Sequence, residues 1–251
     1  PVSLTALQRA IELNGVKIEA NQQAFTWGRI AAHDPSAIAA LLDGGARSKQ
    51  DTLDEMVATR REFLSAYQDD ALAERFTTLV ARVRDAECSV ASDEELTRAV
   101  AQAWFRLLSY KDEYEVARLH SSPEFLDTVR RDFGNDAKLR FHLAPPFLGG
   151  KKDARGRPLK REFGAWILPV FKVLARLRGL RGTAFDVFGY TAERRMERQL
   201  IVDFEALLDE SLPTLSTENH ERLLESVRGY LEIRGYGPVK ELAVEEMRAT
   251  G

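Results

Sequence analysis

The chain has 251 residues, of which 44% are hydrophobic and 30% charged, and its net charge is −3. A chain of this composition can bury a sizeable core, which excludes global disorder, and its slightly acidic balance argues against nucleic-acid binding. The single cysteine, Cys88, excludes an intrachain disulfide and any cluster held by four cysteines of this chain, and it favours a cytoplasmic location.

The apolar runs of the sequence predict no membrane span. The longest unbroken run, Ala165 to Phe171, has seven residues, whereas a spanning helix needs about 20. Charged residues such as Arg9 and Glu12 interrupt the N-terminal stretch, so it lacks the layout of a signal peptide. Because the chain begins with Pro1 and not with Met, we expect it to be a piece of a longer protein.

Apolar residues recur at helical spacing along most of the chain. Leu72, Phe76, Leu79, Val80 and Val83 are one example, with the spacing i, i+4, i+7, i+8 and i+11. This periodicity predicts a mostly α, multi-helical fold. The expected helices are 3–13, 16–32, 35–43, 51–68, 70–89, 93–109, 111–120, 123–133, 163–178, 192–211, 217–231 and 238–248.

Three start signals support these helices. Ser92 to Glu95 has the pattern of a capping box, in which Ser92 accepts a hydrogen bond from the third helical N–H and Glu95 reaches back. Asp34-Pro35 and Ser122-Pro123 each place a capping residue before a proline at the first helical position.

One segment departs from the helical period. Residues 138–143 alternate strictly, with Leu139, Phe141 and Leu143 on one face, which is the pattern of a strand. A lone strand leaves its backbone groups unpaired and therefore needs a partner. We expect one or two short β-strands, near 138–143 and 230–234, with Leu231 to Ile233 as the internal partner. The alternative partner is a sheet edge outside this chain.

Basic charge is concentrated in one segment. Residues 151–182 carry a net charge of +8, whereas residues 1–150 carry −5 and residues 183–251 carry −6. Gly149 and Gly150 open this segment, and Gly156 and Pro158 keep its first half from being helical. We therefore predict a boundary near residue 150, between a helical domain at 33–150 and a second part at 151–251. This second part would be a basic loop that leads into further helices.

Common catalytic and metal-binding motifs are missing from the sequence. It contains no P-loop, no dinucleotide-binding fingerprint, no nucleophile elbow and no H-E-x-x-H pair. The four histidines lie too far apart to build a metal site from one helix, and Cys88 lies in a helical stretch where we expect a packed thiol. We therefore assign no catalytic, cofactor-binding or metal-binding residue.

Two polar clusters have a plain and a functional interpretation. His142 shares a strand face with Lys138 and Arg140, which fits either an anion-facing cluster or, as we favour, a solvated strand face. Asp112 and Glu115 could suggest acid–base chemistry, but they lie three apart, and we expect a solvated, ion-paired helix.

The basic loop is the best candidate for contact with an anionic group, since arginine forks suit phosphates and carboxylates. A segment that is apolar on nearly all sides, Phe163 to Leu177, follows it directly. The favoured interpretation is a core helix entered through a solvated loop. The alternatives are a docking face for an acidic protein, a helix on a membrane surface, which Pro169 disfavours, and phosphate binding. The candidate docking residues are Lys151, Lys152, Arg155, Arg157, Lys160 and Arg161.

Several stretches resemble a known enzyme family. Residues 3–28, with Ala10, Ile11, Asn21, Ala24, Phe25 and Gly28, are similar to the end of the gamma-type domain of 2-oxoacid:ferredoxin oxidoreductases. This assigns residues 1–32 to the tail of such a domain. Further stretches resemble the C-terminal region of the fused, proteobacterial indolepyruvate ferredoxin oxidoreductase. They are Ser109 to Leu119, Lys138 to Pro146, Lys160 to Trp166, Gly179 to Arg198 and Ile233 to Glu241.

The resemblance implies a parent enzyme that decarboxylates an arylpyruvate and transfers the acyl group to coenzyme A. It also implies thiamine diphosphate, magnesium and iron–sulfur clusters in that enzyme, with ferredoxin as the electron acceptor. The family's cofactor residues map to no position of this chain, so the fragment is expected to hold no cofactor and to be inactive alone. Its expected role is structural, packing on other domains of the same enzyme or docking ferredoxin. A phosphate-binding element for coenzyme A and a free-standing helical interaction module are the alternatives.

Overall fold

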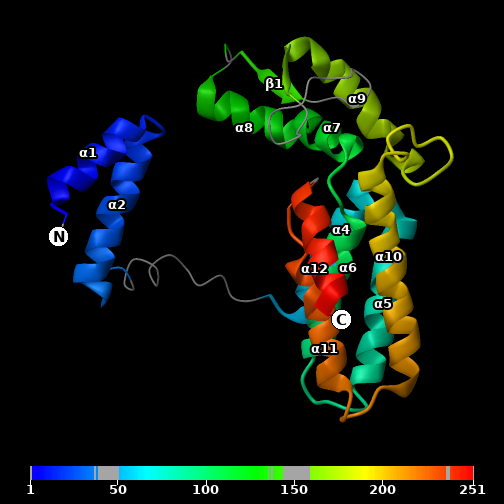
Figure 1. Cartoon of the computed structure of the whole chain (residues 1–251). Coiled ribbons are helices and arrows are strands. Elements are labelled where there is room, and N and C mark those ends of the chain that lie inside the picture. Colours follow the sequence, from blue (N-terminus) through cyan, green and yellow to red (C-terminus); the bar gives the residue numbers. More distant parts are fainter. Residues whose placement is uncertain are drawn as a thin grey trace. The chain divides into compact units, whose positions relative to one another are not determined.

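The computed structural model describes residues 2–36, 38, 51–134, 136, 138–143, 159–235 and 238–250. The chain divides into two compact units, Pro1–Thr52 and Leu53–Gly251. The described residues form eleven α-helices and one antiparallel pair of short strands (Figure 1). The predicted mostly α fold is therefore confirmed. Among these helices, none combines the length and the hydropathy that crossing a bilayer requires.

The first unit is a helical hairpin made of α1 (Leu4–Asn14) and α2 (Ile18–His33). The Ser3 hydroxyl caps α1, and Gly15 ends it in a left-handed conformation that glycine adopts without strain. Neither helix contains a buried residue. Most of the helix predicted at 35–43 lies outside the described residues, so its Asp34 cap stays a prediction.

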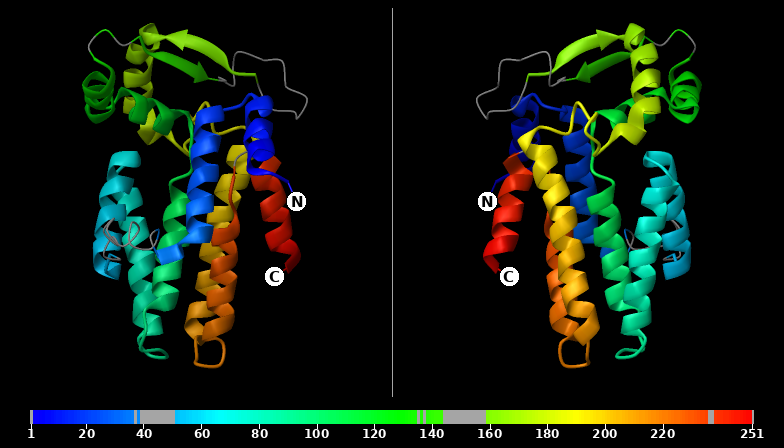
Figure 2. Two further views of the ribbon diagram at one scale, coloured as in Figure 1. Left: turned by 90° about the vertical axis from the view of Figure 1, so that its left-hand side faces the viewer. Right: turned by 90° about the vertical axis from the view of Figure 1, so that its right-hand side faces the viewer.

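Six helices of the second unit form an elongated bundle (Figure 2). Trp104 and Phe204 are fully buried in its core, where their rings stack with centroids 5.7 Å apart. The apolar stripes recognised in the sequence supply these core residues. The six helices are α4 (Leu53–Tyr67), α5 (Asp70–Glu87), α6 (Glu95–Leu108), α10 (Ala192–Ser211), α11 (His220–Glu232) and α12 (Pro238–Thr250).

The remaining elements form an outer layer at one end of the bundle (Figure 1). It has its own small core, made of the buried residues Ala117, Phe141, Ile167 and Phe171. The Ser122 hydroxyl caps α8 with Pro123 at its start, which confirms the predicted cap. The layer comprises α7 (Glu113–Ser121), α8 (Pro123–Phe133), β1 (Arg140–Leu143), β2 (Arg161–Gly164) and α9 (Leu168–Arg176).

The strand predicted near 138–143 is confirmed as β1, but its partner is β2, with Phe141 opposite Phe163. The strand predicted near 230–234 is wrong, because α11 continues to Glu232. An alternation of three residues is too short to distinguish a strand from the end of a helix, and the buried residues Leu223 and Val227 set a helical period there.

The compact units differ from the domain boundary expected near residue 150. β1 and β2 pair across that position, and α7 packs on α9 from the other side of it. Residues on both sides of position 150 therefore belong to one unit, and the division falls between Thr52 and Leu53.

Candidate docking surface

The residues predicted for docking are only partly within the described chain. Lys151, Lys152, Arg155 and Arg157 lie outside the described residues. Lys160 and Arg161 are exposed at the start of β2. The structure thus places two of the six candidates, directly before the segment that carries α9.

The α9 segment exposes a continuous apolar stripe, which we call the α9 stripe. It consists of four residues: Trp166, Val170, Val173 and Leu177. Val170 and Val173 lie on α9, and the other two lie on the short 3-10 turns that flank it. Their spacing of four, three and four residues is that of one helix face. Trp166 is 67% exposed and Val173 is 54% exposed. Single exposed apolar residues are ordinary, whereas a row of four with a tryptophan marks a surface suited to binding another molecule.

The opposite side of α9 is anchored in the small core. Phe171 meets Phe141 edge to face, with ring centroids 5.2 Å apart, and the His120 ring of α7 lies beside both. His120 is itself held by a 2.8 Å hydrogen bond between its Nδ1 and the carbonyl oxygen of Val116. The prediction of a core helix is therefore confirmed for one side of α9 only. Pro169 lies in the first turn, where it breaks no hydrogen bond.

Basic side chains lie next to the α9 stripe. Lys172 and Arg176 are four residues apart, and both are exposed. Since each helical residue turns the chain by about 100°, they form a third side of α9, between the stripe and the core side. Arg178 instead turns inward and donates to the carbonyl oxygen of Gln68. The surface therefore combines an apolar row with positive charge, which suits an acidic partner.

A buried ion pair joins the outer layer to the bundle. Arg181 Nε lies 2.5 Å from Asp112 Oδ2, and its Nη1 donates to the carbonyl oxygen of Tyr67 at the end of α4. Asp112 also caps α7 through the backbone N–H of Glu115. The expected ion pairing of this helix is confirmed by Glu115 and Arg118. The expected solvation is wrong, because Asp112 and Glu115 are buried.

The side chains of this ion pair are almost fully buried, with 3% of Arg181 and 2% of Asp112 exposed. The Arg181 guanidinium stacks on the Tyr67 ring, with its carbon 3.7 Å from the ring centroid. Burial raises the pKa values of Tyr110 and Tyr114 to about 12, and it also raises the pKa of Tyr67. The burial of these three tyrosines, which are 0–7% exposed, makes the junction closed, and the raised pKa values follow from that burial.

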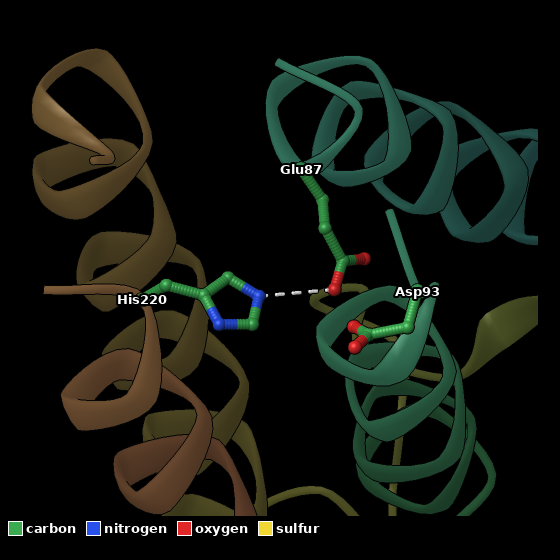
Figure 3. Close-up of side chains that lie close together, drawn as sticks. All are labelled: Glu87, Asp93 and His220. Carbon is green, nitrogen blue, oxygen red and sulfur yellow. Dashed lines mark hydrogen bonds and ion pairs between the residues drawn. The ribbon is translucent and has the colours of Figure 1, made fainter. Parts of the chain in front are cut away.

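A second polar cluster lies where α5 ends and α6 and α11 begin. Glu87, Asp93 and His220 approach one another there (Figure 3). The buried Glu87 carboxylate accepts hydrogen bonds from the backbone N–H groups of Leu96 and Thr97, so it caps α6. The predicted Ser92 capping box is therefore wrong. Helix α6 begins at Glu95, and its cap comes from the end of α5.

The remaining sequence candidates are exposed. Cys88 lies at the end of α5 with an exposed side chain, so the expectation of a packed thiol is wrong. Cys88 keeps helical backbone angles, but it lies about 100° round the helix from the buried Glu87 and so falls off the buried side. His142 and Arg140 are exposed on β1, and Arg140 pairs with Glu162 of β2 at 2.6 Å. This arrangement agrees with the solvated strand face that we favoured.

The fold and these sites define a class: a helical bundle with a small α/β outer layer that leaves one apolar helix face exposed. A family model described as a family of unknown function, DUF6537, matches residues 53–250, and the chain belongs to this family. No curated protein and no solved structure matches the chain. These comparisons do not test the resemblance to the oxidoreductase, which stays a prediction.

Proposed function

We propose that this chain is the C-terminal part of a fused indolepyruvate ferredoxin oxidoreductase and acts there as a docking domain. In this proposal, oxidative decarboxylation and acyl transfer to coenzyme A take place in other parts of the enzyme. Those parts hold the thiamine diphosphate, the magnesium and the iron–sulfur clusters. The present chain contributes a surface on which ferredoxin, an acidic protein, is received.

The observation that carries the docking role is the α9 stripe with its basic border. The stripe is presented by a helix whose other side is packed, so its position is fixed before any partner arrives. Pre-organised surfaces lose little conformational entropy on binding, which favours affinity. Lys172 and Arg176 add positive charge beside the stripe, and attraction of this kind mainly accelerates association.

The sequence carries further positive charge before β2. The +8 segment places four further cations shortly before β2, at positions 151, 152, 155 and 157. The attraction between exposed charges is screened over about 8 Å at physiological salt. The contribution of these residues should therefore be strongest at low ionic strength and should fade as salt is added.

The test uses the full-length enzyme and two acceptors. Replacing Lys151, Lys152, Arg155 and Arg157 by Ser should slow ferredoxin reduction at low salt through the association rate. Decarboxylation measured with an artificial acceptor should remain unchanged. A second variant, Lys172→Ser with Arg176→Ser, should have the same effect if the α9 border takes part.

The matched control for the second variant is Arg61→Ser with Arg222→Ser. It also removes two positive charges, from exposed positions on α4 and α11. It should leave both acceptors unaffected. Equal losses with both acceptors would indicate a folding or domain-packing role instead. Unchanged ferredoxin kinetics at low salt in both sets of variants would contradict the docking role.

A further inference from the structure

We propose that Glu87, Asp93 and His220 form a binding site for a divalent transition-metal ion of the zinc class. One ligand atom from each residue lies within 4.8 Å of the other two (Figure 3). The three residues come from three different segments: the end of α5, the connection between α5 and α6, and the first turn of α11. The packing of the helices therefore brings these donors together, and no local sequence motif predicts the site.

Glu87 is already oriented as a metal ligand needs to be. The residue is 1% exposed. Oε2 accepts from the Thr97 backbone N–H and hydroxyl, and Oε1 accepts from the Leu96 N–H. Hydrogen bonds of this kind fix ligating carboxylates in metal sites. The remaining lone pair of Oε1 faces Nε2 of His220, so a metal bound there leaves the cap of α6 intact.

The spacing of the Glu87 and His220 donor atoms fits a tetrahedral ion. His220 Nε2 lies 3.1 Å from Glu87 Oε1. Two ligands at the zinc bond lengths of about 2.0–2.1 Å and at a tetrahedral angle lie about 3.3 Å apart. A metal ion could therefore replace the hydrogen between these two atoms with only a small movement.

Asp93 supplies the third ligand. Its carboxylate is turned toward Glu87 and His220 (Figure 3). Among the described residues, it makes no hydrogen bond or ion pair. Because its side chain is exposed, it can rotate by the small distance that coordination requires without disturbing the core.

Charge and donor type select the ion. Two carboxylates surround one imidazole, and Glu87 is buried, so a positive ion compensates charge that burial makes costly. Imidazole nitrogen suits zinc and its neighbours in the first transition row, whereas magnesium and calcium prefer oxygen ligands alone. A water molecule would complete the fourth position of a tetrahedral ion.

A change of Asp93 separates metal binding from the capping of α6, because the cap does not use this residue. The experiment titrates Zn²⁺ into the complete 251-residue chain after chelator treatment, by calorimetry and by thermal unfolding. We expect one ion per chain and a raised melting temperature. Co²⁺ in the same site should give the visible absorption of a tetrahedral complex, and Mg²⁺ should have no effect.

The decisive variant is Asp93→Asn, which should melt like the parent chain without metal. It should bind Zn²⁺ at least about tenfold more weakly, since loss of a ligand should cost no less than loss of a residue that supports one. The control is Asp85→Asn, a change of the same kind at an exposed site on α5, which should bind Zn²⁺ like the parent. The proposal is overturned if Zn²⁺ does not saturate one site per chain. Equal affinities in the two variants would also overturn it.

Discussion

The bundle and the outer layer are stabilised differently, although they belong to one compact unit. The bundle surrounds a large apolar core that draws on all six of its helices. The small core of the outer layer has four buried apolar residues, and the α9 stripe is left in contact with solvent. A cluster of that size cannot offset the conformational entropy of five elements, so the layer depends on its attachment to the bundle.

That attachment includes a buried ion pair. Arg181, Asp112 and the Tyr67 carbonyl form the buried link between the layer and the end of α4. A buried ion pair contributes little net stability compared with apolar packing, but it fixes geometry, and breaking it is costly. The bundle therefore provides most of the stability of this unit, while the outer layer holds the α9 stripe in place. Four predictions follow from this division, beginning with the largest expected effect.

Replacing Arg181 by Ala should cost the most. The change leaves the Asp112 carboxylate buried without its cation, and such losses amount to about 4 kcal/mol in the free energy of unfolding. Urea unfolding measures this cost, and hydrogen exchange should accelerate in α7 and α9. The control is Arg178→Ala, which removes one hydrogen bond to a backbone carbonyl and should cost about 1 kcal/mol. Similar costs for the two variants would contradict the special role of the Arg181 link.

Two phenylalanine truncations compare the cores directly. Phe204→Ala removes a fully buried ring that packs against Trp104, and it should cost about 3 kcal/mol and weaken the whole unit. Phe171→Ala in the small core should instead release α7 and α9 while the bundle keeps its protection against hydrogen exchange. Equal loss of protection in α5 and α10 for both variants would show that the two cores unfold as one.

The sequence predicts the bundle well and the outer layer less well, for a physical reason. Bundle helices bury long apolar stripes, and a stripe of three or four turns has a period that few other structures share. β2 carries a single apolar residue, Phe163, so nothing in its sequence distinguished it from the start of the helix predicted at 163–178. The spurious strand at 230–234 arose from the converse problem, a pattern too short to have a period.

The polar sites were harder to predict than the helices. Arg181 and Asp112 are 69 residues apart, and His220 and Glu87 are 133 residues apart, so only the packing brings them together. The capping box at Ser92 matched a local rule, yet a buried carboxylate from the preceding helix took its place. The sequence shows that α9 is apolar. It does not show that one side of this helix stays exposed to solvent.

The closed junction should make stability depend on alkaline pH. Burial raises the pKa of Tyr110 and Tyr114 to about 12, above the ordinary value near 10. A raised pKa favours the neutral phenol in the folded state. This contribution is therefore complete below about pH 10 and is lost as pH rises toward 12. Removing one such group, by Tyr110→Phe, should flatten the fall in the urea midpoint above pH 10. An unchanged slope would contradict a closed junction.

The smallest effect on stability is expected on the α9 stripe itself. Val173→Ser and Val202→Ser form a matched pair, since both valines lie on helices and are 54% and 55% exposed. Both changes should alter the free energy of unfolding by no more than about 0.5 kcal/mol, because neither side chain is buried.

The effects of these two changes on docking should differ. In the full-length enzyme, Val173→Ser should weaken the interaction with ferredoxin, and Trp166→Ser should weaken it further, since exposed tryptophans often dominate binding energy. Val202→Ser, on the bundle, should leave the interaction unchanged. Half-saturation by ferredoxin, measured at a salt concentration that screens the basic border, separates the apolar contribution from the electrostatic one. If Val173→Ser and Val202→Ser behave alike in that assay, the exposed side of α9 is ordinary protein surface. The outer layer would then have no docking role.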